Sequence, residues 1–324
     1  MSQEQDLTPQ ESDAHASGRG EWTSRSRLSV WLQVMRFRSL AISGIAVSVG
    51  GATALAEGHW SPRILLALAG AIAIQIGTNL TNVSFNWKAV AARGSRPADP
   101  GGSSAPVQLG LVEPVEVRRV AYLTFGVATL IGVWLVWSVG WPILLFGISG
   151  LAVGYFYSAP PIRLAYLGLG VAAVFVTIGP LMVVGSYYTV ALRISPAAVV
   201  ASVPIGLLAA GIMHTNDLRD HEGDIRHGKR TLSTVLGRTA SSRLLLGLVT
   251  GAYLTIPAGI AVSLLPWPTL IVVVTLPLAV RQVRLVFGER DSKRLNEAWF
   301  MGVRLMTSFG ALFVVGLLVG AWLG

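Results

Sequence analysis

Long apolar segments recur along this chain with only short interruptions. Nine of them can cross the membrane, which needs about 30 Å at about 1.5 Å per helical residue. They lie near residues 39–56, 63–87, 117–139, 141–158, 165–187, 197–217, 241–264, 267–286 and 301–323. Of the 324 residues, 52% are hydrophobic and only 13% are charged, so one water-soluble core could not bury this surface. The sequence therefore predicts an all-α polytopic membrane protein with about nine transmembrane helices.

The basic residues are distributed unevenly between the two sides implied by nine spans. All 25 Lys and Arg except Arg63 and Arg193 fall in segments on one side or at the adjoining helix ends. Because Lys and Arg concentrate in cytoplasmic loops, this side and the N-terminus are expected in the cytoplasm, and the protein in the plasma membrane. The net charge of +9 then acts as a topology signal, with the lipid bilayer as the partner and no nucleic acid expected.

The N-terminal residues differ in composition from the rest of the chain. Residues 1–28 are rich in Ser, Gly, Glu, Gln and Asp and lack an apolar core, which predicts a disordered cytoplasmic tail and no signal peptide. Residues 29–324 are expected to form one transmembrane domain. The chain has no Cys, which excludes disulfides and thiolate metal sites and leaves oxygen atoms as the ligands for a metal ion.

A first polar segment ends the second apolar run. Its three asparagines, Asn79, Asn82 and Asn86, are spaced by three and four residues and therefore share one helix face. Amides at this depth need partners. They either form hydrogen bonds between helices or mark a helix end that settles into the lipid headgroups, or they line the polar wall of a ligand cavity.

A second polar segment spans residues 213–231. Asn216, Asp220 and Asp224 repeat every four residues, which stacks two carboxylates and an amide on one helical face. Stacked carboxylates repel unless a cation lies between them, and oxygen ligands of this kind suit Mg²⁺ bridging to phosphate. The neighbouring cations that could contact phosphate oxygens are Arg219, Arg226, Lys229 and Arg230. The alternative is a solvated, salt-bridged loop, but so dense a cluster starting inside an apolar helix favours a site.

Three histidines accompany this segment, His214, His221 and His227. Their spacings of seven and six residues fit no zinc motif, so they are expected at the surface or supporting the site.

With these motifs, the chain resembles the UbiA superfamily of membrane prenyltransferases over about residues 31–324. Within it, the chain looks most like the 1,4-dihydroxy-2-naphthoate polyprenyltransferases. The family's second acidic motif, N-x-L-R-D-x-E-x-D followed by G-K-R-T, is similar to residues 216–224 and 228–231. The central Y-x-G-L-G-E stretch is similar to 166–171, where Val171 replaces the acid, and A-R-P-K-T-L is similar to 35–40. The first motif, N-L-x-N-D-Y-x-D, aligns with residues 79–86, where Val83 and Asn86 replace both aspartates.

The resemblance implies nine helices around a central cavity open to the cytoplasmic side and to lipid. It implies transfer of a polyprenyl group from an allylic diphosphate to an aromatic acceptor, with 1,4-dihydroxy-2-naphthoate of menaquinone biosynthesis as a candidate. The implied catalytic residues are Asp220, Asp224 and Asn216, and the implied cofactor is Mg²⁺ on Asp220 and Asp224. The implied diphosphate-binding residues are Asn79, Asn82, Asn86, Lys88, Arg219, Lys229 and Arg230.

Loss of the first-motif aspartates keeps two other functions open. With Val83 and Asn86 in place, a two-metal clamp is not expected, and one Mg²⁺ on Asp220 and Asp224 remains. A terpene cyclase of the same superfamily would trap the allylic cation with an internal alkene. A non-catalytic isoprenoid-binding membrane protein would keep the cavity without the chemistry.

Overall fold

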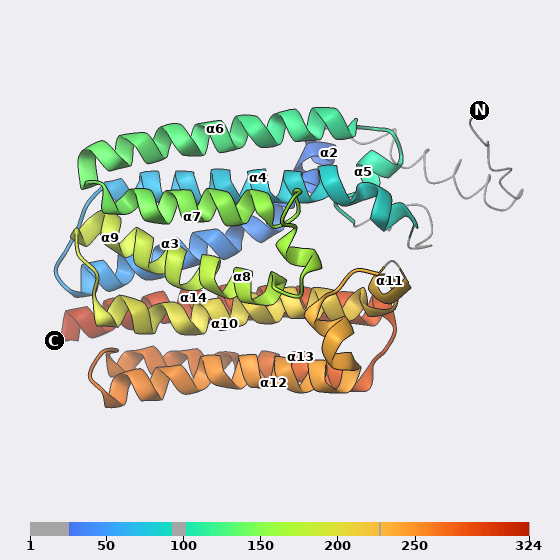
Figure 1. Ribbon diagram of the computed structural model, residues 1–324. Helices are drawn as coiled ribbons and strands as arrows, with labels where there is room; N and C mark the ends of the chain where they lie inside the picture. The colour runs from blue at the N-terminus through green and yellow to red at the C-terminus, as the bar shows by residue number, and fades with distance from the viewer. Residues whose placement is uncertain (1–25, 93–101, 227, 324) are drawn as a thin grey trace, which may run out of the picture.

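The computed structural model describes residues 26–92, 102–226 and 228–323, without the side chains of residues 88–92. In these ranges the chain forms helices and no β-strand (Figure 1). The predicted all-α membrane fold is confirmed. The proposed tail falls almost entirely outside the described residues, and helix α2 already begins at Arg27, capped by the Ser26 side chain.

Within the described part of the chain, eight helices are long and apolar enough to cross a membrane. They are Phe37–Ala56 (η1 Phe37–Ser39 with α3 Leu40–Ala56), α4 (Arg63–Ala92), α6 (Pro114–Val139), Gly170–Ala191 (α8 Gly170–Val176, η3 Thr177–Val184, α9 Gly185–Ala191), α10 (Pro196–Arg219), α12 (Leu232–Ala261), Trp267–Gly288 (η4 Trp267–Thr275, α13 Leu276–Gly288) and α14 (Ser292–Leu323). Helix α7 (Pro142–Phe156) occupies the one remaining predicted segment, 141–158, but has only 15 residues.

Four short elements were not predicted. They are α2 (Arg27–Val34), α5 (Ala105–Gln108), η2 (Leu164–Tyr166) and α11 (His221–Arg226). Figure 1 shows α2, α5 and α11 at one end of the bundle, whereas the C-terminal end of α14 lies at the opposite end. Their sequences are too short or too polar to give an apolar period, which is why the pattern of long apolar runs missed them.

Several predicted boundaries were wrong, and the local chemistry explains two of them. The fifth span begins at Gly170 rather than 165, because η2 takes residues 164–166 into a separate turn. Helix α12 begins at Leu232 rather than 241. Its N-terminus is fixed by a capping box, in which the Thr231 and Thr234 side chains each accept from the other's backbone N–H.

Helix α10 forms the centre of the bundle, and α6 lies at its outer edge (Figure 1). In α10, 61% of the most apolar stretch is buried by protein, against 17% in α6, so α10 packs on protein and α6 faces lipid. Small residues allow a close approach here: a Cβ on Gly179 of η3 would lie 2.9 Å from the Gly206 Cα of α10. This packing carries the polar C-terminal end of α10 to the same end of the bundle as α2 and α5.

Candidate functional site

We call Asn79, Asn82 and Asn86 of α4 the asparagine wall. Asn79 is buried and uses its amide inside the protein. Its Nδ2 donates to the Met35 main-chain oxygen at 2.9 Å and to Ser39 Oγ at 3.1 Å, while its Oδ1 accepts from Gln75 at 3.4 Å. Asn79 thus holds the turn that leads into α3, and its role in binding diphosphate stays a prediction.

The other two asparagines connect α4 to different parts of the chain. Asn82 Nδ2 donates to Ser158 Oγ at 2.9 Å, just beyond α7, and Asn82 Oδ1 accepts from an Arg36 guanidinium nitrogen at 3.4 Å. Asn86 Oδ1 accepts from the Tyr166 hydroxyl at 2.7 Å. Because the partners are protein groups, these bonds match the expected hydrogen bonds between segments and not immersion in lipid headgroups, and the cavity wall stays a prediction. The side chain of Lys88, two residues further along, lies outside the described residues.

We call residues 216–231 the acidic segment. Asp220 caps the end of α10, and both of its carboxylate oxygens accept from Arg219, at 2.9 and 3.1 Å. The same guanidinium donates to Asn216 Oδ1 at 2.6 Å and to Asn296 Oδ1 of α14 at 3.1 Å. Arg219 is therefore engaged by protein oxygens on three sides and orients Asp220.

The segment continues through α11 with the predicted spacing. The Asp224 N–H donates to the Asp220 main-chain oxygen at 2.8 Å, so the two carboxylates remain one helical turn apart despite the break in the helix. The Asp224 side chain is fully buried, and its Oδ2 accepts from Lys229 Nζ at 3.1 Å. Arg230 is exposed, and its backbone forms a single β-bridge with Leu167.

The asparagine wall and the acidic segment meet at one end of the bundle. Arg36, which donates to the wall, lies close enough to Asp220 to interact with it electrostatically. Tyr166, whose hydroxyl donates to the wall, presents its ring to Lys229 Nζ at 5.6 Å from the ring centre. Two links therefore join segments that are far apart in the sequence.

Three further polar residues lie here that were not among the predicted site residues. Asp217 is 3% exposed, and its main-chain oxygen accepts from the Ser233 hydroxyl at 3.1 Å. Tyr157 follows α7, and burial together with nearby Asp217 raises the pKa of its hydroxyl, which stays neutral. Asn296 reaches Arg219 from α14. An Asp inside the acidic motif was visible in the sequence, but the contacts of Tyr157 and Asn296 depend on helix packing.

Of the two expected positions for the histidines, at the surface or supporting the site, the structure gives His214 and His221 the buried, supporting one. His214 is fully buried and pairs with the Ser241 main-chain oxygen at 2.9 Å. His221 is buried with Nδ1 2.7 Å from Ser233 Oγ, and burial, reinforced by Arg238, lowers its pKa. His227 lies outside the described residues.

The donor set of the site suits Mg²⁺ in kind. Asp220 and Asp224 offer carboxylate oxygens, and Asn82 and Asn86 offer amide oxygens. Among the described residues, no three Asp, Glu, His or Cys side chains converge into a ready-made metal cluster. One or two carboxylates, with water and phosphate oxygens completing the octahedron, are the usual arrangement for Mg²⁺.

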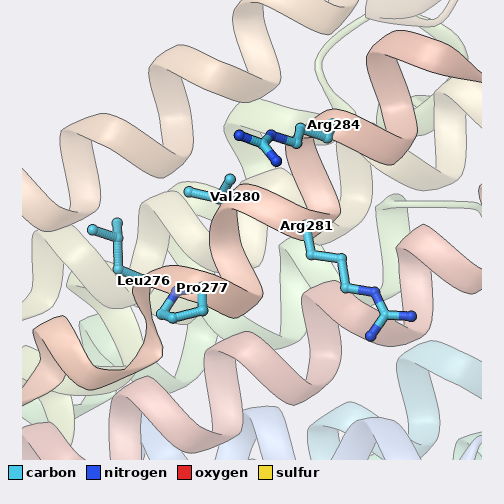
Figure 2. Close-up of a pocket in the computed structure, with 5 residues that line it drawn as sticks. All are labelled: Leu276, Pro277, Val280, Arg281 and Arg284. Carbon is cyan, nitrogen blue, oxygen red and sulfur yellow. The ribbon is translucent and has the colours of Figure 1, made fainter.

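One groove of about 450 Å³ lies elsewhere, on α13 (Figure 2). It is lined by Leu276, Pro277, Val280, Arg281 and Arg284, and Figure 2 shows the two arginine side chains extending from this helix in different directions. None of these residues belongs to the asparagine wall or the acidic segment. The groove is therefore separate from the polar site.

Comparison with known proteins shows which family this chain belongs to. The model of the UbiA prenyltransferase family matches residues 104–305. The 1,4-dihydroxy-2-naphthoate octaprenyltransferase of Escherichia coli is 31% identical, with 92% of this chain and 97% of that protein covered. The enzyme of the same name from Bacillus subtilis is 28% identical, with 89% and 91% covered. A UbiA homologue from Archaeoglobus fulgidus, solved with DMAPP and Mg²⁺, shares the fold at a TM-score of 0.58 and 14% identity, with 88% and 99% covered. The predicted resemblance is confirmed, and the chain belongs to the UbiA prenyltransferase family.

Proposed function

We propose that this membrane prenyltransferase moves a polyprenyl group from an allylic diphosphate to 1,4-dihydroxy-2-naphthoate. The main observation behind this proposal is that the asparagine wall meets the acidic segment. Their meeting brings positive charges and oxygen ligands together at one end of an apolar helical bundle. A diphosphate needs the polar end, and a polyprenyl chain needs the apolar interior. The names of the relatives from Escherichia coli and Bacillus subtilis support naphthoate as the acceptor.

The diphosphate would lie between Asn82 and Asn86 on one side and the acidic segment on the other. Lys229 is only 10% exposed, so its charge acts on phosphate oxygens with little screening by water. When bound by Asp220 and Asp224, Mg²⁺ would supply the positive charge that stabilises the departing diphosphate. Arg219 fixes the Asp220 carboxylate, and Asn216 fixes Arg219.

In the transfer, the bond between C1 of the prenyl group and the diphosphate oxygen breaks, and its electron pair leaves with the diphosphate. A ring carbon of the acceptor forms the new bond to C1, and the acceptor ring then releases a proton. The intermediate or transition state has allylic-cation character, so water must be kept away from it. The buried apolar faces of α3, α10 and α14 provide such surroundings.

We also propose that the site faces the cytoplasm of a plasma-membrane protein. Allylic diphosphates carry a charged head that reaches the enzyme from water. The end of the bundle that holds α2, α5 and α11 is the end that the Lys and Arg distribution assigns to the cytoplasm.

The direct test incubates the purified full-length protein in lipid with a radiolabelled allylic diphosphate, with and without Mg²⁺ and 1,4-dihydroxy-2-naphthoate. We expect label on the naphthoate only when both are present. Conversion of the diphosphate without an acceptor would instead identify a cyclase. Binding of the diphosphate without consumption under any acceptor would identify a non-catalytic isoprenoid-binding protein, and either result would overturn the proposal.

A further inference from the structure

The groove on α13 combines apolar and basic side chains on one stretch of helix (Figure 2). Leu276, Pro277 and Val280 form its apolar lining, and Arg281 and Arg284 form its basic lining. All five residues are exposed. Leu276, Val280 and Arg284 are spaced by four residues, and Figure 2 shows them on one side of the helix. The groove therefore has an apolar end and a basic end.

The basic end of the groove points toward the end of the bundle that holds α2, α5 and α11. Arg284 lies four residues before Gly288, the last residue of α13, which is about 6 Å along the helix axis. Helix α14 begins soon afterwards at Ser292, and its C-terminal end lies at the opposite end of the bundle (Figure 1). Leu276 lies eight residues before Arg284, about 12 Å further into the bundle. The groove thus runs from the apolar depth of the membrane toward its boundary with water.

The surroundings of this groove are lipid rather than protein. Only 28% of the most apolar stretch of the span Trp267–Gly288 is buried by protein. An arginine on such a surface is costly unless its charge reaches the headgroups or an anion.

The two arginines of the groove have no anionic partner within the described part of the chain. Neither forms an ion pair or a hydrogen bond there. Other arginines near this end of the bundle do have acidic partners: Arg238 of α12 pairs with Glu222 at 3.5 Å, and Arg294 of α14 pairs with Glu297 at 3.3 Å. The positive charge of the groove is therefore available to an anion from outside the chain.

An anionic phospholipid matches both ends of the groove. Its phosphate oxygens can accept hydrogen bonds from a guanidinium, and an acyl chain can cover the apolar residues that lie deeper. A soluble anion would use only the basic end, and an uncharged lipid would leave the arginines without a counter-charge.

We propose that the α13 groove binds an anionic phospholipid, with the headgroup phosphate at Arg284 and an acyl chain along Val280 and Leu276. Arg281 extends from the other side of the helix (Figure 2), so it adds a second positive charge and contributes less than Arg284. The groove is separate from the asparagine wall and the acidic segment, and the inference does not depend on the proposed function.

The test titrates the purified full-length protein in detergent with phosphatidylglycerol or phosphatidylcholine and measures the affinity for the first bound lipid by native mass spectrometry. We expect the wild type to bind phosphatidylglycerol more tightly than phosphatidylcholine. Arg284→Gln should weaken phosphatidylglycerol binding about fivefold, the usual contribution of one basic residue near anionic lipid, and Arg281→Gln should weaken it less. Neither change should alter phosphatidylcholine binding.

Arg304 of α14 offers a matched control for these arginines. It is exposed, and it lies at a similar depth, because Gly302 of α14 faces Gln282 of α13: a Cβ on Gly302 would lie 2.6 Å from Gln282 Nε2. It does not line the groove. Arg304→Gln should therefore leave the affinity for phosphatidylglycerol unchanged.

A second pair of measurements separates a lipid from a soluble anion. Val280→Trp keeps both arginines but fills the apolar part of the groove, so it should also weaken phosphatidylglycerol binding. Inorganic phosphate at the concentration of the lipid should not displace it, because phosphate has no acyl chain to cover the apolar residues.

Several outcomes would overturn the inference. Equal affinity of the wild type for the two lipids, wild-type affinity in both arginine variants, or the same loss in Arg304→Gln would show that the groove does not select an anionic lipid. Wild-type affinity in Val280→Trp, or displacement by inorganic phosphate, would show a simple anion site instead. Val280→Trp decides the result if Arg284→Gln fails to fold.

Discussion

Among single residues, the Asp224 carboxylate should tolerate substitution least. Its side chain is fully buried against Lys229, so Asp224→Asn leaves a nearly buried ammonium without its counter-charge and removes a proposed Mg²⁺ ligand. We expect kcat/KM for prenyl transfer to fall by about 100-fold or more, a usual consequence of losing charge stabilisation in a site. The measurement is the radiolabel transfer assay at saturating Mg²⁺.

Glu222 provides the control for Asp224, because it is an acid on the same short helix. Its side chain is 72% exposed and pairs with Arg238 at 3.5 Å. Glu222→Gln should retain activity close to the wild type, since exposed pairs contribute little. Unchanged activity in Asp224→Asn would contradict the role given to the acidic segment.

Glu57, at the opposite end of the bundle, connects α3 to α9 and to the start of α10. It accepts hydrogen bonds from Tyr187 at 2.5 Å, from Arg193 at 3.0 Å and from Ser195. Burial alone would raise the pKa of Glu57, but these hydrogen bonds outweigh it and lower the pKa below its usual 4.5. The resulting stabilisation is present above pH 4.5 and is lost as the pH falls through the lowered pKa.

We therefore expect Glu57→Gln to lower the free energy of unfolding by about 1–2 kcal/mol at neutral pH. The difference from the wild type should shrink as the pH falls below 4.5. Thermal unfolding in detergent across this pH range measures it. Glu297→Gln, which removes an exposed carboxylate paired with Arg294, is the control and should show no such difference. A difference that stays constant with pH would contradict the charge-dependent explanation.

The individual motif residues could largely be named from the sequence, but their contacts could not. Spacing alone placed Asp220 and Asp224 one turn apart, and the backbone bond between them agrees. Spacing could not reveal that Asn79 would use its amide on the Met35 and Ser39 turn, because that contact joins residues 40 or more positions apart. Arg36 belongs to the motif at residues 35–40, but its contact with Asn82 depends on a left-handed turn that no glycine signals.

Among the contacts between helices, that of α10 with α8 and η3 leaves no space for a side chain at Gly206. A Cβ on Gly206 would lie 2.8 Å from the Phe175 main-chain oxygen and 3.1 Å from the Gly179 Cα. Main chain cannot move aside as a flexible side chain can, so Gly206→Ala should force the helices apart and destabilise the protein by about 1–3 kcal/mol. The midpoint of thermal unfolding in detergent should fall accordingly.

Gly247 of α12 serves as the matched control for this contact. A Cβ there meets no atom within 4 Å, so Gly247→Ala adds only helix propensity and should leave the midpoint unchanged or raise it. If Gly206→Ala behaved like Gly247→Ala, close packing would not explain the glycine in α10.

The long helices were predictable because lipid imposes one requirement on each of them, a run of apolar residues long enough to satisfy every backbone group internally. Their ends were less predictable, since polar caps and short turns decide them. The start of α12 depends on Thr231 and Thr234, which an apolar run does not include. The short α7 meets the apolar requirement but is only 15 residues long, so its length does not by itself show a full span.

Over the whole molecule, the sequence predicted that the two polar segments lie on one side of the membrane, since an even number of spans separates them. It could not predict that they touch. That contact requires η2 to place Tyr166 between α4 and Lys229, and the loop containing Ser103 to meet Arg36. Hydropathy therefore predicts that the two segments lie at the same depth in the membrane. It does not predict which helices pack side by side, and this packing brings the segments together.

The proposed orientation can be tested cleanly because the chain contains no Cys. We expect a single Cys at Arg294, an exposed residue at the start of α14, to be shielded from a membrane-impermeant maleimide in intact cells and labelled after lysis. A single Cys at Trp60, an exposed residue between α3 and α4, should be labelled in intact cells. These two residues belong to opposite ends of the bundle, so each variant is the control for the other. The reverse pattern would place the acidic segment outside the cell, away from any cytoplasmic diphosphate, and would contradict the orientation on which the proposed substrate supply depends.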